Sequence, residues 1–311
     1  MNFGRYTFNC SFLTHAVLPD YKAVIFRDCF ARAFKQAVCV LRSRSCDECL
    51  LRSECLYAMV FEISHGKISS CNQHSHPFVI EPPETRSLRY LPDDSFMFHL
   101  LLFGDTTLKL PYFIHAAKLM GENGFGRRAG GLFTINSVRC GETIIYSEED
   151  QILRQPPIMD LHCCIDSNEV HSSVRLKVYF QTPLRLKYEN RLASQLPFHL
   201  LIRACLRRIS MLLSSFDAGE PIIDYTGIVS DAQHIPILKS NLRRLDWKGY
   251  SFRQKQEIHL GGIVGDVSYE GNLSRFLPLI KFCRHTHIGK QTTFGLGRFD
   301  LEATETDNIS Q

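Results

Sequence analysis

The sequence has no long hydrophobic run. None of its 311 residues belongs to a stretch that approaches the roughly 20 apolar residues of a membrane-spanning helix, and the N-terminus has no segment typical of a signal peptide. These absences predict a cytoplasmic protein with no membrane partner. In that reducing setting the 12 cysteines are expected to be thiols or metal ligands rather than a disulfide framework.

The sequence also has little excess charge, with 36 Lys and Arg against 32 Asp and Glu and a formal net charge of +4. The excess is local, in "LIRACLRR" at 201–208 and in "SNLRRLDWKGYSFRQK" at 240–255. Local basic segments are typical of a surface that binds a polyanion. Solvated helix and loop faces would give the same pattern, so both interpretations stand for each segment.

The pattern of apolar residues repeats once along the chain. The first half predicts strand, helix, strand and strand at residues 5–19, 23–41, 78–83 and 94–104. A second helix, a glycine-rich loop and a last strand follow within residues 110–138. The second half repeats that order, at residues 171–186, 197–216, 243–254, 257–271 and 274–285 before a last strand. This is the ferredoxin-like βαββαβ plan twice over. We therefore predict an α+β protein with domains at 1–150 and 160–311, and a cysteine-rich insert at about 38–80.

Two glycine-rich segments occupy equivalent places in the two halves: "GFGRRAGG" at 124–131 and "GKQTTFGLG" at 289–297. The second is no Walker A motif, because Gln291 stands where Ser or Thr is needed, and neither segment leads from a strand into a helix as a dinucleotide site does. A tight helix-to-strand connection would explain each segment alone. The repetition, with adjacent cations, favours contact with nucleic-acid phosphates. The residues in question are Arg127, Arg128, Gly289, Lys290, Gln291, Thr292, Gly295, Gly297 and Arg298.

Four segments of the second half occur in an order that resembles the CRISPR repeat-processing endoribonucleases, the Cas6 family of the RAMP superfamily. They are residues 174–210, "WKGYSFRQ", "LGGIVGDVSYEGNLSRFLPLI" and "HIGKQTTFGLGRF", and the first half fits more loosely. The resemblance implies two tandem ferredoxin-like, RRM-like domains. It also implies that the protein binds CRISPR repeat RNA, cleaves precursor transcripts into guide RNAs, and serves other Cas effector subunits. Arg203 and Arg207, four residues apart on one predicted helix, would contact that RNA or face solvent.

The chemistry implied by this resemblance is attack of the RNA 2′-hydroxyl on the adjacent phosphorus, which leaves a 2′,3′-cyclic phosphate and a 5′-hydroxyl. It needs a base, an acid and positive charge, but no metal or other cofactor. His287 is the first candidate for the base, with His285 and His15 as alternatives. Lys290 and the backbone amides of the glycine-rich segment would hold the scissile phosphate.

One departure from the family keeps a second interpretation open. Many members carry the catalytic histidine on or near the first helix, and residues 24–38 contain none. The alternative is a RAMP subunit that grips repeat RNA without cutting it. A zinc-dependent DNA-binding regulator is a third hypothesis, but no helix-turn-helix or finger pattern accompanies the cysteines.

Four cysteines lie within seventeen residues: Cys39, Cys46, Cys49 and Cys55. Their spacing is C-x6-C-x2-C-x5-C, and four thiolates can hold zinc or an iron–sulfur cluster. The resemblance supports this, because some relatives carry a similar cluster after the first helix. We predict a structural metal, with zinc ahead of iron–sulfur. A chance cluster of buried thiols is the alternative.

Overall fold

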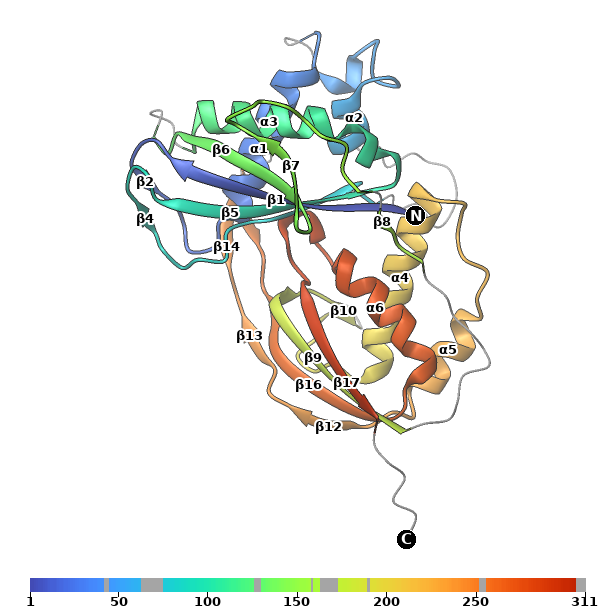
Figure 1. Cartoon of the computed structure of the whole chain (residues 1–311). Coiled ribbons are helices and arrows are strands. Elements are labelled where there is room, and N and C mark those ends of the chain that lie inside the picture. Colours follow the sequence, from blue (N-terminus) through green and yellow to red (C-terminus); the bar gives the residue numbers. More distant parts are fainter. Residues whose placement is uncertain are drawn as a thin grey trace. The chain divides into compact units, whose positions relative to one another are not determined.

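The computed structural model describes residues 1–41, 45–62, 75–125, 130–157, 159–162, 173–188, 191–251 and 256–305. The chain divides into two compact units (Figure 1). The first unit comprises Met1–Asp160 and Tyr250–Gln256, and the second comprises Leu161–Gly249 and Glu257–Gln311. None of the helices within these described ranges is long and apolar enough to cross a membrane.

The first unit is built on one antiparallel sheet, whose strands run in the order β3-β5-β1-β6-β7. Helices α1 and α3 cover one face of it, as Figure 1 shows. The order β6-β1-β5-β3, with one helix after the first strand and one after the third, is the ferredoxin-like plan. The strands are β1 (Asn2–Phe12), β3 (Phe78–Glu81), β5 (Ser95–Phe103), β6 (Phe133–Cys140) and β7 (Thr143–Ser147); the helices are α1 (Ala23–Val38) and α3 (Leu110–Asn123). Short β8 (Met159–Asp160) also pairs with β1.

Alternation and helical spacing produce the core of this unit. In β1 every second side chain from Tyr6 to Phe12 is buried, so one face of the strand meets the helices. On α1, Phe26, Phe30 and Phe34 recur every four residues and are all buried. The core is therefore rich in phenylalanine, and the Phe8 and Phe98 rings stack across β1 and β5 with centroids 4.6 Å apart.

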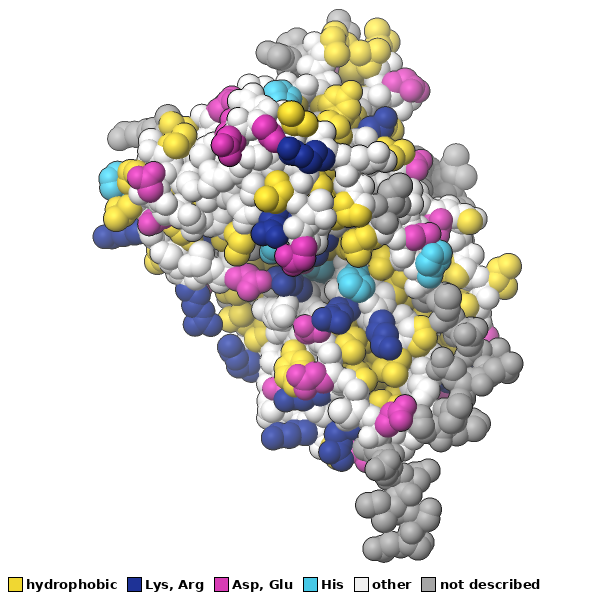
Figure 2. All heavy atoms as spheres, viewed as in Figure 1, with side chains coloured by type: hydrophobic (Ala, Val, Ile, Leu, Met, Phe, Trp, Pro, Cys, Tyr) yellow, Lys and Arg dark blue, Asp and Glu magenta, His cyan; other side chains and the backbone are white. Residues whose placement is uncertain are grey.

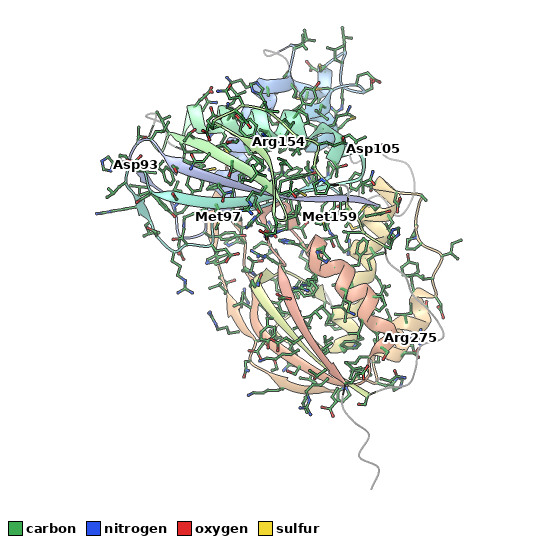
Figure 3. The ribbon with its side chains drawn as sticks, viewed as in Figure 1. Asp93, Met97, Asp105, Arg154, Met159 and Arg275 are labelled. Atoms are coloured by element: carbon green, nitrogen blue, oxygen red, sulfur yellow. The ribbon has the colours of Figure 1, made fainter. Side chains whose placement is uncertain are left out.

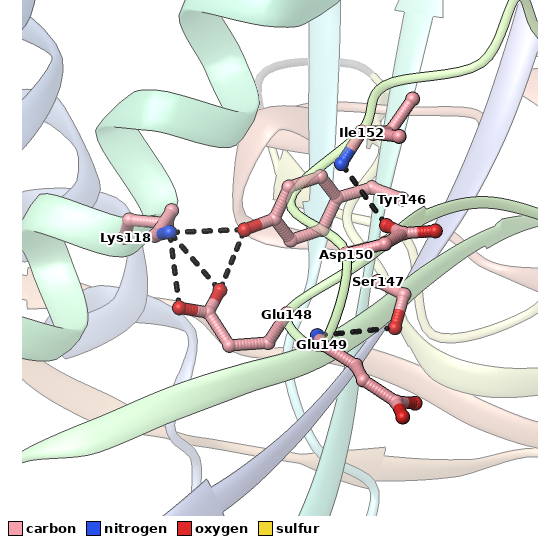
Figure 4. Close-up of polar contacts among 7 residues, drawn as sticks. All are labelled: Lys118, Tyr146, Ser147, Glu148, Glu149, Asp150 and Ile152. Atoms are coloured by element: carbon pink, nitrogen blue, oxygen red, sulfur yellow. Dashed lines mark hydrogen bonds and ion pairs between the residues drawn. The ribbon is translucent and has the colours of Figure 1, made fainter.

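A polar cluster fastens β7 to α3 (Figure 4). Lys118 Nζ of α3 donates to Tyr146 Oη at 2.9 Å and pairs with Glu148 at 3.0 Å, while Tyr146 donates to Glu148 at 2.5 Å. Burial, together with the hydrogen bond to Glu148, raises the pKa of Tyr146. The hydroxyl therefore stays protonated, and it can donate to one neighbour and accept from the other.

The remaining short elements of the first unit connect these layers. Helix α2 (Leu56–Phe61) places Phe61 against Phe34 and Phe78, with ring centroids 5.6 and 4.9 Å apart. The others are β2 (Ala16–Val17) paired with β4 (Arg89–Tyr90), η1 (Cys46–Glu48) and η2 (Gly104–Lys109). Several residues at the surface of this unit, including Asp93, Met97, Asp105, Arg154 and Met159, are labelled in Figure 3.

The second unit repeats the plan, with an antiparallel sheet in the order β12-β16-β9-β17. Helices α4 and α6 pack on each other and follow the first and third strands of this plan. The main elements are β9 (Ser173–Leu184), α4 (Phe198–Phe216), β12 (Ile237–Ser240), β16 (Gly262–Asn272), α6 (Leu277–Thr286) and β17 (Phe299–Glu305). The predicted tandem ferredoxin-like, α+β fold is therefore confirmed.

An extra helix, α5 (Tyr225–Ala232), packs on α4. Asp224 caps it by accepting from the Gly227 N–H at 2.9 Å. Arg275, labelled in Figure 3, pairs with Asp231 of α5 and so joins that helix to η3 (Ser274–Phe276).

The prediction for the second strand of this unit is wrong. The sequence predicts one strand at 243–254, but β12 occupies that place in the sheet and pairs with β16. The predicted segment instead forms β13 (Arg243–Leu245), which also pairs with β16, and β14 (Lys248–Ser251), which forms a separate ribbon with β15 (Gln256–His259). Every described side chain of β12 is exposed, so its sequence has no alternating apolar pattern to reveal it.

Candidate nucleic-acid interface

The second glycine segment forms a compact loop between α6 and β17, which we call the C-terminal loop (residues 287–298). Its backbone turns through positive φ at His287, Gly289, Gln291, Gly295 and Gly297. At Gly297 only glycine fits, because a Cβ there would lie 1.8 Å from the Ile288 carbonyl oxygen. The glycines are therefore required by the shape of the loop itself.

The backbone amides of this loop donate inside the second unit. Lys290 N–H donates to Arg185 O at 2.9 Å, Gly297 N–H to Pro183 O at 3.0 Å, and Arg298 N–H to Thr182 Oγ1 at 2.9 Å. Ile288, Phe294 and Gly295 N–H donate to carbonyls of the loop itself. These six amides are therefore already engaged within the unit and are not directed at a phosphate, contrary to the expectation that they would hold one.

His287 closes the loop from the inside. Its side chain is only 1% exposed, and Nδ1 lies 3.1 Å from the Leu296 carbonyl oxygen. A carbonyl only accepts, so Nδ1 carries the proton, and Nε2 holds the lone pair in the neutral ring. A substrate hydroxyl could reach that lone pair only if the ring became accessible.

A buried arginine holds the end of α6 next to this histidine. Arg208 of α4 is 6% exposed and donates to the Thr286 carbonyl from Nε at 3.0 Å and from Nη2 at 2.7 Å. Burial lowers its pKa to about 10, so the guanidinium remains charged at neutral pH. The positive group meets a helix C-terminus, where the backbone dipole favours a cation.

Four cations of the second unit gather beside the C-terminal loop. Lys290 is exposed, and its pKa is lowered first by partial burial and then by Lys187, Arg207 and Arg185. Because like charges raise one another's energy, such a cluster is stabilised when an anion lies among them. Arg203 extends the cluster by one turn of α4, and it lowers the pKa of His199 after the larger effect of burial.

A pocket of about 370 Å³ opens next to this cluster. Its walls come from α4, α5 and β10 (Lys187–Tyr188), a short strand that pairs with β11 (Arg191–Leu192). Lys187, Arg203 and Arg207 line it together with Tyr188 and Glu220. The structure therefore brings together three predicted residues, Lys290, Arg203 and Arg207, and adds four that sequence analysis missed: Arg185, Lys187, Tyr188 and His199.

The open face of the second sheet has a different electrostatic character. Arg175 pairs with Glu270 at 2.8 Å, Lys177 with Asp266 at 3.8 Å, and Tyr179 donates to Glu302 at 2.7 Å. Each of these groups already meets a carboxylate, so the face offers little net attraction to a polyanion. More Lys and Arg side chains follow the edge formed by β12 and β13 (Figure 2); they include Lys239, Arg243 and Arg244.

The other predicted site residues differ in exposure, and two of them are outside the described residues. His285 is exposed on the last turn of α6, Thr292 is buried, and Gln291 and Arg298 are half-buried. His15 belongs to the first unit, where its ring is exposed and its carbonyl accepts from the Gly131 N–H at 3.0 Å. Arg127 and Arg128 lie outside the described residues.

The four predicted metal ligands are all in the described part of the chain. Cys39, Cys46, Cys49 and Cys55 are half-buried thiols, and three of them line a cavity of about 530 Å³ with Cys46 elsewhere. Within the described ranges, no group of three or more His, Cys, Asp or Glu side chains is arranged to hold a metal ion. The metal stays a prediction from the sequence.

Two family models match the chain. Residues 178–299 match the model described as CRISPR-associated endoribonuclease Cas6, and residues 1–158 match the AF_1859 N-terminal domain. A search of curated proteins finds no match to this chain.

Solved Cas6 structures share the fold across 97% of the chain. A Cas6 product complex has 13% identity and a TM-score of 0.56 over 99% of that chain, and the Cas6 of Thermus thermophilus has 11% identity and a TM-score of 0.55 over 98%. A chain in a partial Cas6-RT-Cas1–Cas2 complex has 15% identity and a TM-score of 0.55. The present chain spans 46% of the length of that larger one, and 29% of the corresponding chain in a further such complex.

Proposed function

Because the chain belongs to the family of CRISPR-associated endoribonucleases, Cas6, we propose that it binds CRISPR repeat RNA and cleaves precursor transcripts into guide RNAs. The observation that carries the proposal is the family match over residues 178–299. That range contains the C-terminal loop up to Arg298 and all five cations beside it. A cluster of like charges around a rigid loop is suited to an RNA backbone.

Phosphate binding follows from the charges of this cluster. Lys290, Lys187, Arg207 and Arg185 repel one another in the free protein, and a phosphate placed among them would relieve that repulsion. Neutralising RNA phosphates also releases bound counterions, so affinity should fall steeply with salt. The paired charges on the open face of the second sheet make that face a weaker site.

The proposed reaction is attack of the RNA 2′-hydroxyl on the neighbouring phosphorus without a metal ion. A base removes the hydroxyl proton, an acid protonates the departing 5′-oxygen, and Lys290 stabilises the negative charge on the phosphate in the transition state. The products are a 2′,3′-cyclic phosphate and a 5′-hydroxyl.

Three histidines are candidates for the base, and their exposure separates them. His285 and His15 are exposed and can meet RNA directly. His287 is buried with Nδ1 donating to Leu296, so it could act as the base only after the loop opens. Without such opening, His287 positions the loop and does not touch the reacting atoms.

A second function has specific support. Residues 23–38 of α1 contain no histidine, and the histidine at the C-terminal loop is buried. Both observations fit a RAMP subunit that binds repeat RNA without cleaving it. Some proteins of similar fold form part of complexes described as Cas6-RT-Cas1–Cas2. We therefore propose other Cas proteins as partners under either function.

The test is a cleavage assay on CRISPR repeat RNA in excess chelator, with the product ends mapped. Wild type is compared with His15→Ala, His285→Ala and His287→Ala. Cutting at one site that leaves a cyclic phosphate supports the metal-independent enzyme. The variant that abolishes cutting while retaining RNA affinity identifies the base. Tight binding with intact RNA supports the binding subunit instead, and absence of both binding and cutting overturns both functions.

A further inference from the structure

The pocket between α4, α5 and β10 combines features that phosphate binding alone does not need. Besides its cations it has two tyrosines, Tyr188 and Tyr225, an apolar wall that includes Leu200 and Val229, and one carboxylate, Glu220. We propose that this pocket takes one unpaired nucleotide of the RNA and that Glu220 selects a base carrying an exocyclic amino group. The inference rests on the proposed function, since it supplies the RNA.

The size of the pocket points to a single nucleotide. Its volume, about 370 Å³, lies near the lower end of the range for small-molecule sites, about 300–1,000 Å³. An RNA duplex could contact only the rim. Sequence-specific proteins commonly read RNA through unstacked bases that enter such pockets.

The rim and the wall suit the two ends of a nucleotide. Lys187, Arg203 and Arg207 provide positive charge for the flanking phosphates. Tyr188 is 39% exposed, and its ring lies edge-on to His199 at 6.5 Å between centroids, which leaves an aromatic surface for a base. The Tyr225 hydroxyl donates to the Pro221 carbonyl at 3.3 Å, so its ring is held in place. A stacked base therefore has both a platform and a charged clamp.

Glu220 is the group that would discriminate between bases. Glu220 is exposed, and Ser210 Oγ donates to its Oε1 at 2.6 Å, which orients the carboxylate at the pocket. Within the described part of the chain, Glu220 has no ion pair, even though three cations share the same lining. A carboxylate only accepts, so it favours the amino group of cytosine, adenine or guanine and disfavours the carbonyl-rich edge of uracil. It would also repel an acidic peptide.

The experiment measures binding of fluorescein-labelled single-stranded RNA octamers, C8 and U8, to the full chain. The two pyrimidines stack similarly but differ in the amino group that cytosine carries. We expect wild type to bind C8 about 10-fold more tightly than U8. In Glu220→Gln this ratio should fall below about 3, because a carboxamide can accept from cytosine and donate to uracil. Tyr188→Ala should weaken both octamers about 10-fold.

Two matched variants control for charge and aromatic loss elsewhere in the unit. Glu305→Gln removes one exposed carboxylate at the end of β17, and Tyr179→Ala removes an aromatic from the open sheet face. Both should keep the wild-type ratio and affinity.

Each outcome decides a different question when repeat-RNA cleavage is measured in parallel. Equal affinity of wild type for C8 and U8, or an unchanged ratio in Glu220→Gln, overturns the pocket inference even if repeat RNA is cut. Selective C8 binding without cleavage supports the pocket and removes the enzyme proposal. If neither octamer nor repeat RNA binds, both proposals are wrong.

Discussion

Replacing Arg208 by Met tests how the C-terminal loop is held. The guanidinium donates twice to the Thr286 carbonyl from a buried position, at 3.0 and 2.7 Å. Methionine would fill a similar volume but leave that carbonyl without these donors. An unsatisfied buried acceptor of this kind destabilises a protein by about 1–3 kcal/mol. Loss of a cation at the C-terminus of α6 adds about 0.3–1 kcal/mol. Part of this loss is offset, because the methionine variant no longer buries a charged group. We expect the free energy of unfolding to fall by about 2–3 kcal/mol.

Urea unfolding followed by circular dichroism measures this change in free energy. In thermal unfolding we expect Tm to fall by about 4–12 °C. Arg208→Lys keeps the positive charge but offers fewer hydrogen-bond donors. Its free energy of unfolding should lie between those of wild type and Arg208→Met. Arg207→Met is the matched control, because the neighbouring arginine is exposed and its loss should change stability by less than about 0.5 kcal/mol. If Arg208→Met is as stable as Arg207→Met, the two hydrogen bonds do not stabilise the loop as argued.

Three further predictions concern charge, pH and the cysteines. Lys290→Ala should weaken binding to all repeat-like RNAs similarly and make the salt dependence of log affinity shallower by about 0.7–0.9, measured by titration at several salt concentrations; an unchanged slope would exclude a phosphate contact. The pKa of His199 is lowered in the fold, so the unfolded chain binds more protons between that pKa and about 6.5. Stability should therefore rise with pH through this window, and His199→Gln should flatten the unfolding profile, whereas an unaltered profile would refute the assignment. If the cysteine segment holds zinc, purified protein should contain about one zinc ion per chain by elemental analysis, and Cys49→Ser should remove it; metal-free wild type that is equally stable would leave the thiols structural.

The regular elements were predictable because their side chains have one buried face. Apolar residues recur at helical spacing along α4 and alternate with polar ones along β9. Both elements form where the sequence predicts them. Strand β12 has no such signal, since its exposed side chains carry no alternation and only pairing with β16 makes it a strand. Tertiary contact, rather than local preference, decides such an edge strand.

The cationic cluster was predictable only in part, for a related reason. Arg203 and Arg207 share a helix face, so helical spacing alone brings them together. Arg185 and Lys187 join Lys290 only because the chain after β9 lies beside a loop more than a hundred residues later. The burial of His287 depends likewise on a carbonyl nine residues further along, and no local pattern encodes that contact.

The internally bonded amides of the C-terminal loop imply that its geometry exists before any ligand arrives. A flexible glycine-rich segment would lose about 1–2 kcal/mol of backbone freedom per residue when ordered by RNA. Here that ordering belongs to folding, because Ile288, Lys290, Gly297 and Arg298 already donate within the unit. RNA binding then immobilises chiefly side chains, so association should be fast. Differences in affinity between RNAs should then depend mainly on the flexibility of the RNA itself. Substituting a glycine in this loop should consequently lower the free energy of unfolding, and any loss of RNA affinity would follow from that loss of stability.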